Sequence, residues 1–285
     1  GKHREKNREA TGLRKLLYYC KSHMWCSFAL AILVSVLIIL LILMVYMKTQ
    51  YYNYLVSTTY TTQNALLDSV NKNVENQMEN FVTIGSGISI DNELMGVIAN
   101  LEKNEDAYNK KILNNTLKAK SRTSASIAGI ALASQEGVIY QYDKNEITLA
   151  GSVTIWNEEN QKEIQSTFED LKEKSSSALL PRYDIITQPI VHPNLKNVGL
   201  IHIAFPVKEE NSYTNIRYML VISYYSRSLD NLLEQLNPND EEYIQGYIED
   251  EKSSILLHTK GLEYVNVSSS TYNGEDRVKD LAEEV

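Results

Sequence analysis

An unbroken apolar run near the N-terminus limits most strongly what this chain can be. From Trp25 to Met47 the sequence contains no charged residue. As a helix rising about 1.5 Å per residue, this run would reach roughly 34 Å, enough to cross a hydrocarbon core of about 30 Å. It ends in "VYMKTQYY", which lacks the small residues of a signal-peptidase site. We therefore expect an uncleaved transmembrane helix at residues 25–47.

Charged residues on the two sides of this run predict its orientation. Seven Lys or Arg and only two Glu precede Trp25, whereas Lys48 is the one charged residue in the next stretch, up to Asp68. Because cytoplasmic flanks carry the excess of positive charge, we expect a cytoplasmic basic arm at residues 1–24 and an extracellular body anchored in the plasma membrane. The whole chain carries a net charge of −8, so the body is acidic, and nucleic acid is not expected as its partner.

Helical periodicity continues beyond the membrane run. Apolar residues recur at helical spacing from Leu55 to Phe81, with no proline or glycine in between. We expect one long helix that "GSG" at residues 85–87 breaks, then two short helices, the first capped by Asp91. Residues 48–120 would form this helical stalk and the short helices that lead into a sheet. A dimer contact along the membrane-near half and packing on the chain's own domain are both open interpretations of the stripe.

From Ser124 onward the pattern changes to short β-branched and aromatic runs separated by turn-type residues. The runs are "SASIAGIALAS", "GVIYQYD", "YDIITQPIV", "VGLIHIAFPV" and "IRYMLVISYY". Their spacing, with a helix expected at residues 157–174, predicts an α+β fold in which helices flank an antiparallel sheet. Residues 121–236 would form this module. The segment "YIQGYIEDEKSSILLHT" would open a second sheet in a further module, residues 237–285.

No sequence motif for catalysis or metal binding stands out. The five histidines show no helical pairing with each other, and there is no Cys-x-x-Cys. Signatures of phosphate-binding loops, serine hydrolases and kinases are missing from the sequence. We therefore predict no catalytic residue, no metal site and no cofactor in this chain.

A ligand-binding site is the more informative hypothesis, because one face of a sheet can form the wall of a pocket. Alternation along "GVIYQYD" places Tyr140 and Tyr142 on one face with Val138, and in "GLIHIAF" His202 faces one side. If the two sets share a face, their polar tips could fix a small solute; ordinary strand residues with solvated tips are the alternative. A loop that could fold over the sheet adds further candidates. The candidate ligand-binding residues are Tyr140, Tyr142, Trp156, Arg182, Tyr183, Asp184 and His202.

The order of these parts resembles the Cache sensor region of bacterial membrane receptors. The residues that carry the resemblance are "SVNKNVENQMENFVTIGSGISIDNELMGVI", "ASIAGIALASQEGVIYQYD", "VGLIHIAFPV", "RYMLVISYYSRSLDNLLEQL" and "GYIEDEKSSILLHTKG". The resemblance implies a double-Cache sensor with a distal PAS-like module at residues 121–236 and a truncated membrane-proximal module at residues 237–285. It also implies a small-molecule ligand, a second membrane helix after Val285 and a cytoplasmic output.

Among whole proteins, the arrangement looks most similar to the sensor histidine kinases of two-component systems. Chemotaxis receptors, diguanylate cyclases and membrane-bound transcription regulators share the same front end. The sequence "LPRYD" lacks the tryptophan of the Arg-x-Trp-Tyr pattern in amino-acid-binding double-Cache domains, so amino acids are not the expected ligands. Our hypothesis is a homodimeric sensor whose ligand shifts the long helix. An anchored non-sensory surface protein and a tethered exported enzyme are the rival hypotheses.

Overall fold

A computed structural model describes most of the predicted body. It covers residues 24–146, 153–175, 182–208, 215–237, 247–249 and 255–258. The chain divides into two units, Gly1–Ala65 and Leu66–Val285, which we treat separately. The predicted basic arm up to residue 23, and the acidic end of the chain, lie outside the described residues.

The first unit consists, where described, of the N-terminal part of helix α2 (Met24–Ser89). This helix contains a stretch long and apolar enough to cross a membrane, and the side chains of that stretch are exposed. The helix passes without interruption through the β-branched "VSTTYTT". There the hydroxyls of Thr61 and Thr62 donate to the carbonyls of Ser57 and Thr58 at 2.8 Å, which satisfies them within the helix. The predicted continuity between apolar run and stalk is confirmed.

The predicted break at residues 85–87 is wrong, because α2 continues through both glycines and ends at Ser89. Gly85 is buried, and a Cβ atom added there would lie 2.3 Å from the ring of Phe205 and 3.0 Å from the hydroxyl of Tyr224. The Tyr224 hydroxyl donates to the carbonyl of Phe81 at 2.7 Å, and the two rings stack with centroids 4.4 Å apart. Gly85 therefore allows the sheet to approach the helix closely and does not end it.

Two short helices follow, as the sequence predicts. They are α3 (Asn92–Lys103) and α4 (Ala107–Ser121). Asp91 caps α3 by accepting the backbone N–H of Leu94 at 3.0 Å, which confirms its predicted role. Lys120, near the end of α4, lies 2.9 Å from the carboxylates of both Asp91 and Glu93 and so joins the two helices.

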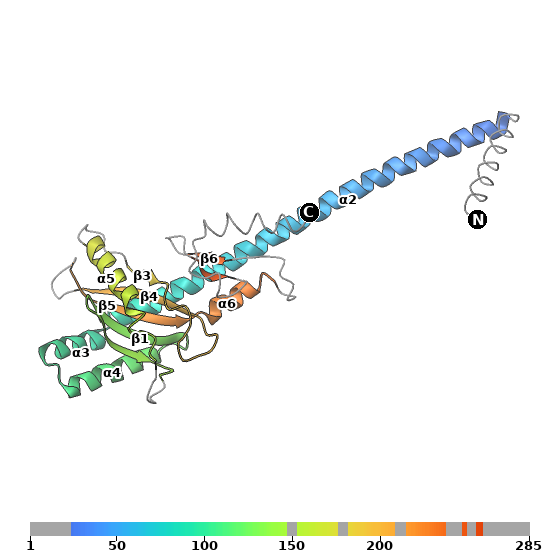
Figure 1. Ribbon diagram of the computed structural model, residues 1–285. Helices are drawn as coiled ribbons and strands as arrows, with labels where there is room; N and C mark the ends of the chain where they lie inside the picture. Colours follow the sequence, from blue (N-terminus) through green and yellow to red (C-terminus); the bar gives the residue numbers. More distant parts are fainter. Residues whose placement is uncertain are drawn as a thin grey trace. The chain divides into compact units, whose positions relative to one another are not determined.

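Five antiparallel strands form the sheet, in the order β2-β1-β5-β4-β3. They are β1 (Ile127–Ser134), β2 (Gly137–Asp143), β3 (Asp184–Ile186), β4 (Leu200–Lys208) and β5 (Ile216–Tyr225). Helix α5 (Gln161–Ser175) lies between β2 and β3 in the chain (Figure 1). The predicted α+β class and antiparallel sheet are confirmed.

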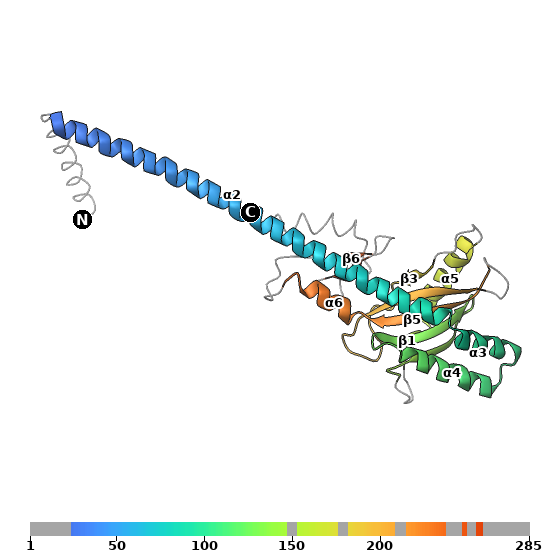
Figure 2. The ribbon, with the colours of Figure 1, turned by 180° about the vertical axis from the view of Figure 1, so that it is seen from behind.

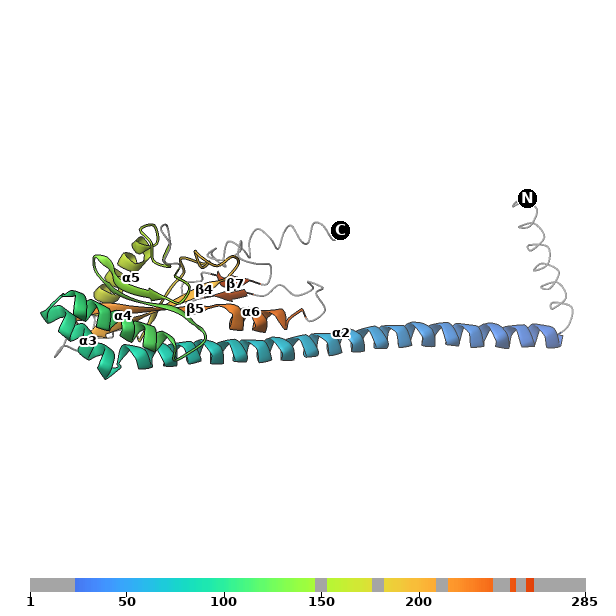
Figure 3. The same ribbon diagram turned by 90° about the horizontal axis from the view of Figure 1, so that it is seen from below.

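The two faces of this sheet bury different cores. One face packs on α3, α4 and the part of α2 beyond Leu66, and the other is covered by α5 (Figure 3). The helix-side core includes Phe81, Leu94, Leu113 and Tyr224. The α5-side core consists of the α5 residues Ile164, Phe168 and Leu171 with Ile155 and Trp156, packed on strand residues that include four alanines. Those alanines are Ala128, Ala131, Ala133 and Ala204.

After β5 the chain forms helix α6 (Arg227–Glu234; Figure 2). Its Leu229 and Leu233 are buried in the helix-side core. Strands β6 (Tyr247–Glu249) and β7 (Ile255–His258) then pair antiparallel in a separate two-stranded sheet. The strand pair predicted for this region is thus present. Its assignment to a second module stays a prediction.

Candidate functional site

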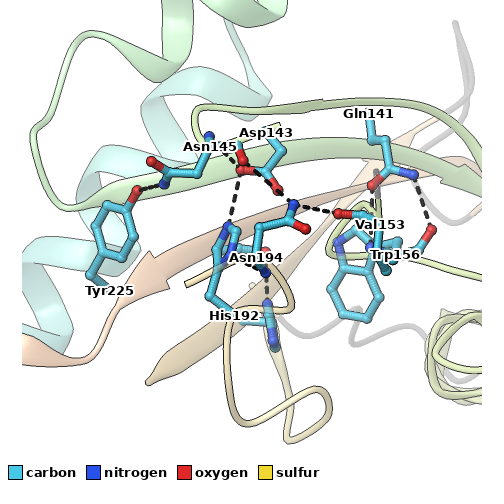
Figure 4. Close-up of polar contacts among 10 residues, drawn as sticks. Gln141, Asp143, Asn145, Val153, Trp156, His192, Asn194 and Tyr225 are labelled. Carbon is cyan, nitrogen blue, oxygen red and sulfur yellow. Dashed lines mark hydrogen bonds and ion pairs between the residues drawn. The ribbon is translucent and has the colours of Figure 1, made fainter. Parts of the chain in front are cut away.

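A cluster of buried and half-buried side chains, joined by hydrogen bonds, lies on the α5-covered face of the sheet (Figure 4). Strand β2 contributes Gln141 and Asp143, which share a face because strand residues alternate. The loop before α5 and the loop between β3 and β4 add Trp156, His192 and Asn194. We call the residues Gln141, Asp143, Asn145, Trp156, His192, Asn194, His202, Ser223 and Tyr225 the polar cluster.

Asp143 and His192 form the centre of the polar cluster. Both are almost fully buried, with 3% and 2% of their surface exposed. The Oδ1 atom of Asp143 accepts the backbone N–H of Asn145 at 2.8 Å and lies 3.1 Å from Nε2 of His192. Since Nδ1 of His192 accepts the backbone N–H of Asn194 at 3.1 Å, the ring hydrogen is on Nε2 and is donated to Asp143.

A tight loop positions His192. Its backbone N–H donates to the carbonyl of Val198 at 2.8 Å, and Val191 and Gly199 form an isolated antiparallel bridge. Asn197 closes the loop with a positive φ of 60°, which asparagine tolerates better than most residues. The turn-type sequence "HPNLKN" therefore folds back on itself and presents His192 to the sheet.

Asparagine side chains close the edge of the polar cluster. The Nδ2 group of Asn194 donates to the carbonyls of Val153 and, at 3.4 Å, Asn145. The side chain of Asn145 donates to the hydroxyl of Tyr225, and burial raises the pKa of that hydroxyl. These contacts tie β2, β5 and two loops together at one point.

Gln141 holds the segment before α5 against the sheet. Its Nε2 donates to the carbonyl of Trp156 and to the hydroxyl of Thr154, both at 3.0 Å, and its Oε1 accepts the backbone N–H of Trp156 at 3.2 Å. Gly129 opposes Asp143 in the ladder, and a Cβ atom there would lie 2.8 Å from the backbone oxygen of Tyr142 and 3.2 Å from Ile155. Gly129 thus leaves the space in which Ile155 packs on the sheet.

His202 lies beneath Trp156, fully buried, with ring centroids 4.6 Å apart. Its Nε2 donates to the carbonyl of Pro189 at 2.7 Å, so its Nδ1 accepts the hydroxyl hydrogen of Ser223, also at 2.7 Å. Burial lowers the pKa of His202 from 6.5 to about 4, which keeps the ring neutral at ordinary pH.

The structure brings only some of the predicted site residues together. Trp156 and His202 are in contact, and Asp184 lies on the same face, since its ladder partner is Ala204 of the α5-side core. Tyr183 packs instead against the helix-side core. Arg182 lies 3.3 Å from the carboxylate of Glu79 on α2, and both side chains are largely exposed.

Tyr140 and Tyr142 lie on the face opposite His202, so the condition for a joint site, that the two sets share a face, is not met. Both tyrosines pack against the helix-side core, and the hydroxyl of Tyr140 donates to Glu105 at 3.0 Å. The predicted grouping of Val138 with them is wrong, because the β1–β2 register shifts between Leu132 and Ala133, which places Val138 in the α5-side core.

Sequence reasoning missed several members of the polar cluster. Those residues are Gln141, Asp143, Asn145, His192, Asn194, Ser223 and Tyr225. A period-two pattern was available for Gln141 and Asp143, which alternate with the two tyrosines. His192 and Asn194 lie in a sequence that reads only as a turn, so no pattern could place them against β2.

The polar cluster offers hydrogen bonds and one carboxylate, and not a metal site. Among the residues that the structure describes, no group of three or more His, Cys, Asp or Glu side chains is arranged to hold a metal ion. Asp143 is the one acidic residue of the polar cluster. The other side chains of the cluster carry amides, hydroxyls or aromatic rings. Such a set can recognise a small solute by its hydrogen-bonding groups.

Comparison with solved structures finds sensory domains of bacterial receptors among the matches. No family model and no curated protein matches the chain. It is similar to the sensory domain of the Campylobacter jejuni chemoreceptor Tlp3 with isoleucine bound, at 16% identity over 73% of each chain and a TM-score of 0.46. It is also similar to the V. cholerae histidine kinase DctB sensor domain, at 11% identity over 74% of this chain and 72% of that chain, with a TM-score of 0.44.

A further match is the extracellular domain of the histidine kinase described as vpHK1S-Z8, at 14% identity and a TM-score of 0.38. The alignment covers 59% of this chain and only 58% of that chain. At TM-scores below 0.5, these similarities do not assign a ligand, a partner or an output to this chain.

Proposed function

We propose that this chain is the membrane-anchored extracellular part of a sensor, which binds a small solute at the polar cluster and passes the signal across the membrane. The observation that carries the proposal is the polar cluster itself. A sheet face packed only for stability would be expected to bury apolar side chains, whereas this one buries two histidines and an aspartate beside its apolar core. Buried polar groups of this kind are typical of binding sites.

Helix α2 supports the proposed transmission of the signal. Its apolar stretch would anchor the protein, with the basic arm in the cytoplasm, and the same helix contributes Phe81 and Val82 to the core beneath the sheet. A ligand that binds one packing arrangement of the sheet on α2 better than another shifts the population of the two. We expect a homodimer in which α2 moves against its copy.

A two-component sensor histidine kinase is the favoured whole protein. Chemotaxis receptors, cyclases and transcription regulators are the alternatives.

The chain's tryptophans allow a direct test of solute binding. Trp25 and Trp156 are the only two in the sequence, so a Trp25→Phe variant reports on Trp156 in the polar cluster alone. We would screen the full chain in detergent micelles against organic acids, amines, sugars and nucleobases. A true ligand is expected to raise the melting temperature and to change the Trp156 fluorescence with the same saturation curve.

A variant of the opposite face is the matched control for this screen. Tyr140→Phe removes a hydroxyl that contacts Glu105 on the helix side and leaves the polar cluster intact, so its saturation curve should be unchanged. If no compound class produced a saturable change in either signal, the proposal of a solute sensor would be wrong. Stabilisation without any Trp156 response would place the binding site elsewhere.

A further inference from the structure

One oxygen of Asp143 has no hydrogen-bond partner. Its Oδ1 atom has two donors, the ring of His192 and the backbone of Asn145, whereas Oδ2 has no partner among the residues that the structure describes. The side chain of Asp143 is 1% exposed, so this oxygen is also withdrawn from solvent. An unpaired carboxylate oxygen in such a place is costly, because burial removes its hydration.

The charge of Asp143 is not balanced by its neighbours. His192 accepts a backbone N–H through Nδ1, which a doubly protonated ring could not do, so the Asp143–His192 pair keeps one negative charge. Next in the chain, Lys144 donates to the carbonyl of Ser124, and burial lowers the pKa of its amine. Thus neither neighbour directs a positively charged donor at Asp143, as a buried carboxylate would need.

The remaining surroundings suit a small cation. Backbone carbonyls of Asn145 and Val153 point to the side chain of Asn194, next to Asp143 (Figure 4). Carbonyl oxygens accept the hydrogens of an ammonium group, and the aromatic rings of Trp156 and Tyr225 at the two ends of the cluster tolerate an alkyl chain or a positive charge. No second charged group is present in the cluster to bind a carboxylate of the ligand.

We propose that the solute recognised at the polar cluster is a compact organic cation with a primary ammonium group, and that this group donates a hydrogen bond to Oδ2 of Asp143. The inference rests on the proposed function and narrows it to one chemical class. Asn194 closes the cluster over Asp143 through its bonds to the two carbonyls, so these bonds must open for the ammonium group to reach Oδ2. The ammonium group then takes over those acceptors, and no charge stays unpaired.

The inference predicts that replacing Asp143 stabilises the protein without ligand but abolishes its stabilisation by an amine. Asp143→Asn keeps an oxygen that accepts from His192 and Asn145 but removes the unbalanced charge. The empty variant is therefore expected to melt at a higher temperature than the unsubstituted chain, and to lose its response to amines. If Asp143 only stabilised the fold through His192, the variant would melt at a lower temperature.

n-Butylammonium is the probe, and n-butanol is its uncharged counterpart of similar size. Both would be added to the full chain in micelles at pH 7 and constant ionic strength, with melting temperature and Trp156 fluorescence as readouts. At tenfold its dissociation constant, n-butylammonium should raise the melting temperature by roughly 2–4 °C, and n-butanol should not. Asp170→Asn, which removes an exposed carboxylate of α5, should respond like the unsubstituted chain.

Equal shifts by n-butylammonium and n-butanol, or no shift by either, would overturn the inference. An undiminished amine response in Asp143→Asn, or a lower melting temperature of this variant, would overturn it as well. The first two comparisons use the unsubstituted chain, so they decide the question even if Asp143→Asn fails to fold. Saturable stabilisation by acids or neutral solutes alone would leave the proposed sensor function standing and reject only the cationic ligand. Failure of every compound class would reject both.

Discussion

Replacing Gly85 with alanine is expected to lower the free energy of unfolding of the sheet unit by about 1–3 kcal/mol. The added methyl group would lie 2.3 Å from the Phe205 ring, and Phe205 is itself 1% exposed, so the ring has no free space into which it can move. It would also press on the Tyr224 hydroxyl, which donates to Phe81. Denaturant unfolding followed by Trp156 fluorescence in a Trp25→Phe background would measure the change.

Gly87 provides a matched control two residues further along the same helix. A Cβ atom there meets nothing within 4 Å, so Gly87→Ala should raise the free energy of unfolding by roughly 0.5–1 kcal/mol, the usual gain in helix propensity. Opposite signs at the two positions are the expected result. Stabilisation by Gly85→Ala would mean that the sheet does not approach α2 as closely as described.

Acidification is expected to destabilise the sheet unit through His202. Its pKa is about 4 in the folded protein and 6.5 without the effect of burial, so the unfolded chain binds the proton more readily between these values. By linkage, His202 contributes fully to stability above about pH 6.5, and this contribution falls by up to about 1.4 kcal/mol per pH unit as pH drops toward 4. Unfolding free energies at pH 7, 6, 5 and 4.5 would measure this slope.

His202→Gln separates this effect from the titration of surface carboxylates. Glutamine can donate to the carbonyl of Pro189 but binds no proton in this range, so the variant should lose part of the stability at pH 7 and show a flatter profile. The two profiles should therefore converge as the pH falls. Parallel profiles would show that His202 does not account for the pH dependence.

The sequence patterns that predict the fold are those with a repeated local period. The β-branched and aromatic runs "GVIYQYD" and "IRYMLVISYY" form β2 and β5, and the aspartate before "NELMGVIANL" caps α3. The long helix could be predicted because an apolar period needs no information about distant residues. The same local pattern could not predict that the helix continues through Gly85. A glycine can end a helix or allow another part of the chain to pack closely on it, and here the packing partner is Phe205, which is far away in the sequence.

The candidate site was harder to predict because it depends on sheet order and on loops. Tyr140 and His202 lie on strands separated by β1 and β5, so their faces can be compared only once that order is known. A one-residue shift in the β1–β2 register reverses the side of the sheet that a residue faces. His192 and Asn194 reach the cluster through a turn whose composition indicates only that it is a turn.

Two neighbouring tyrosines at the end of β5 bond to opposite sides of the sheet and so restrict how this strand can move. Tyr224 and Tyr225 are neighbours in the chain, yet the hydroxyl of Tyr224 bonds the carbonyl of Phe81 on α2 and that of Tyr225 bonds Asn145 in the polar cluster. One peptide unit therefore separates two bonds on opposite sides of the same strand. Rotation of β5 about its own axis would move the two hydroxyls in opposite directions, so together these bonds fix the rotational setting of the strand.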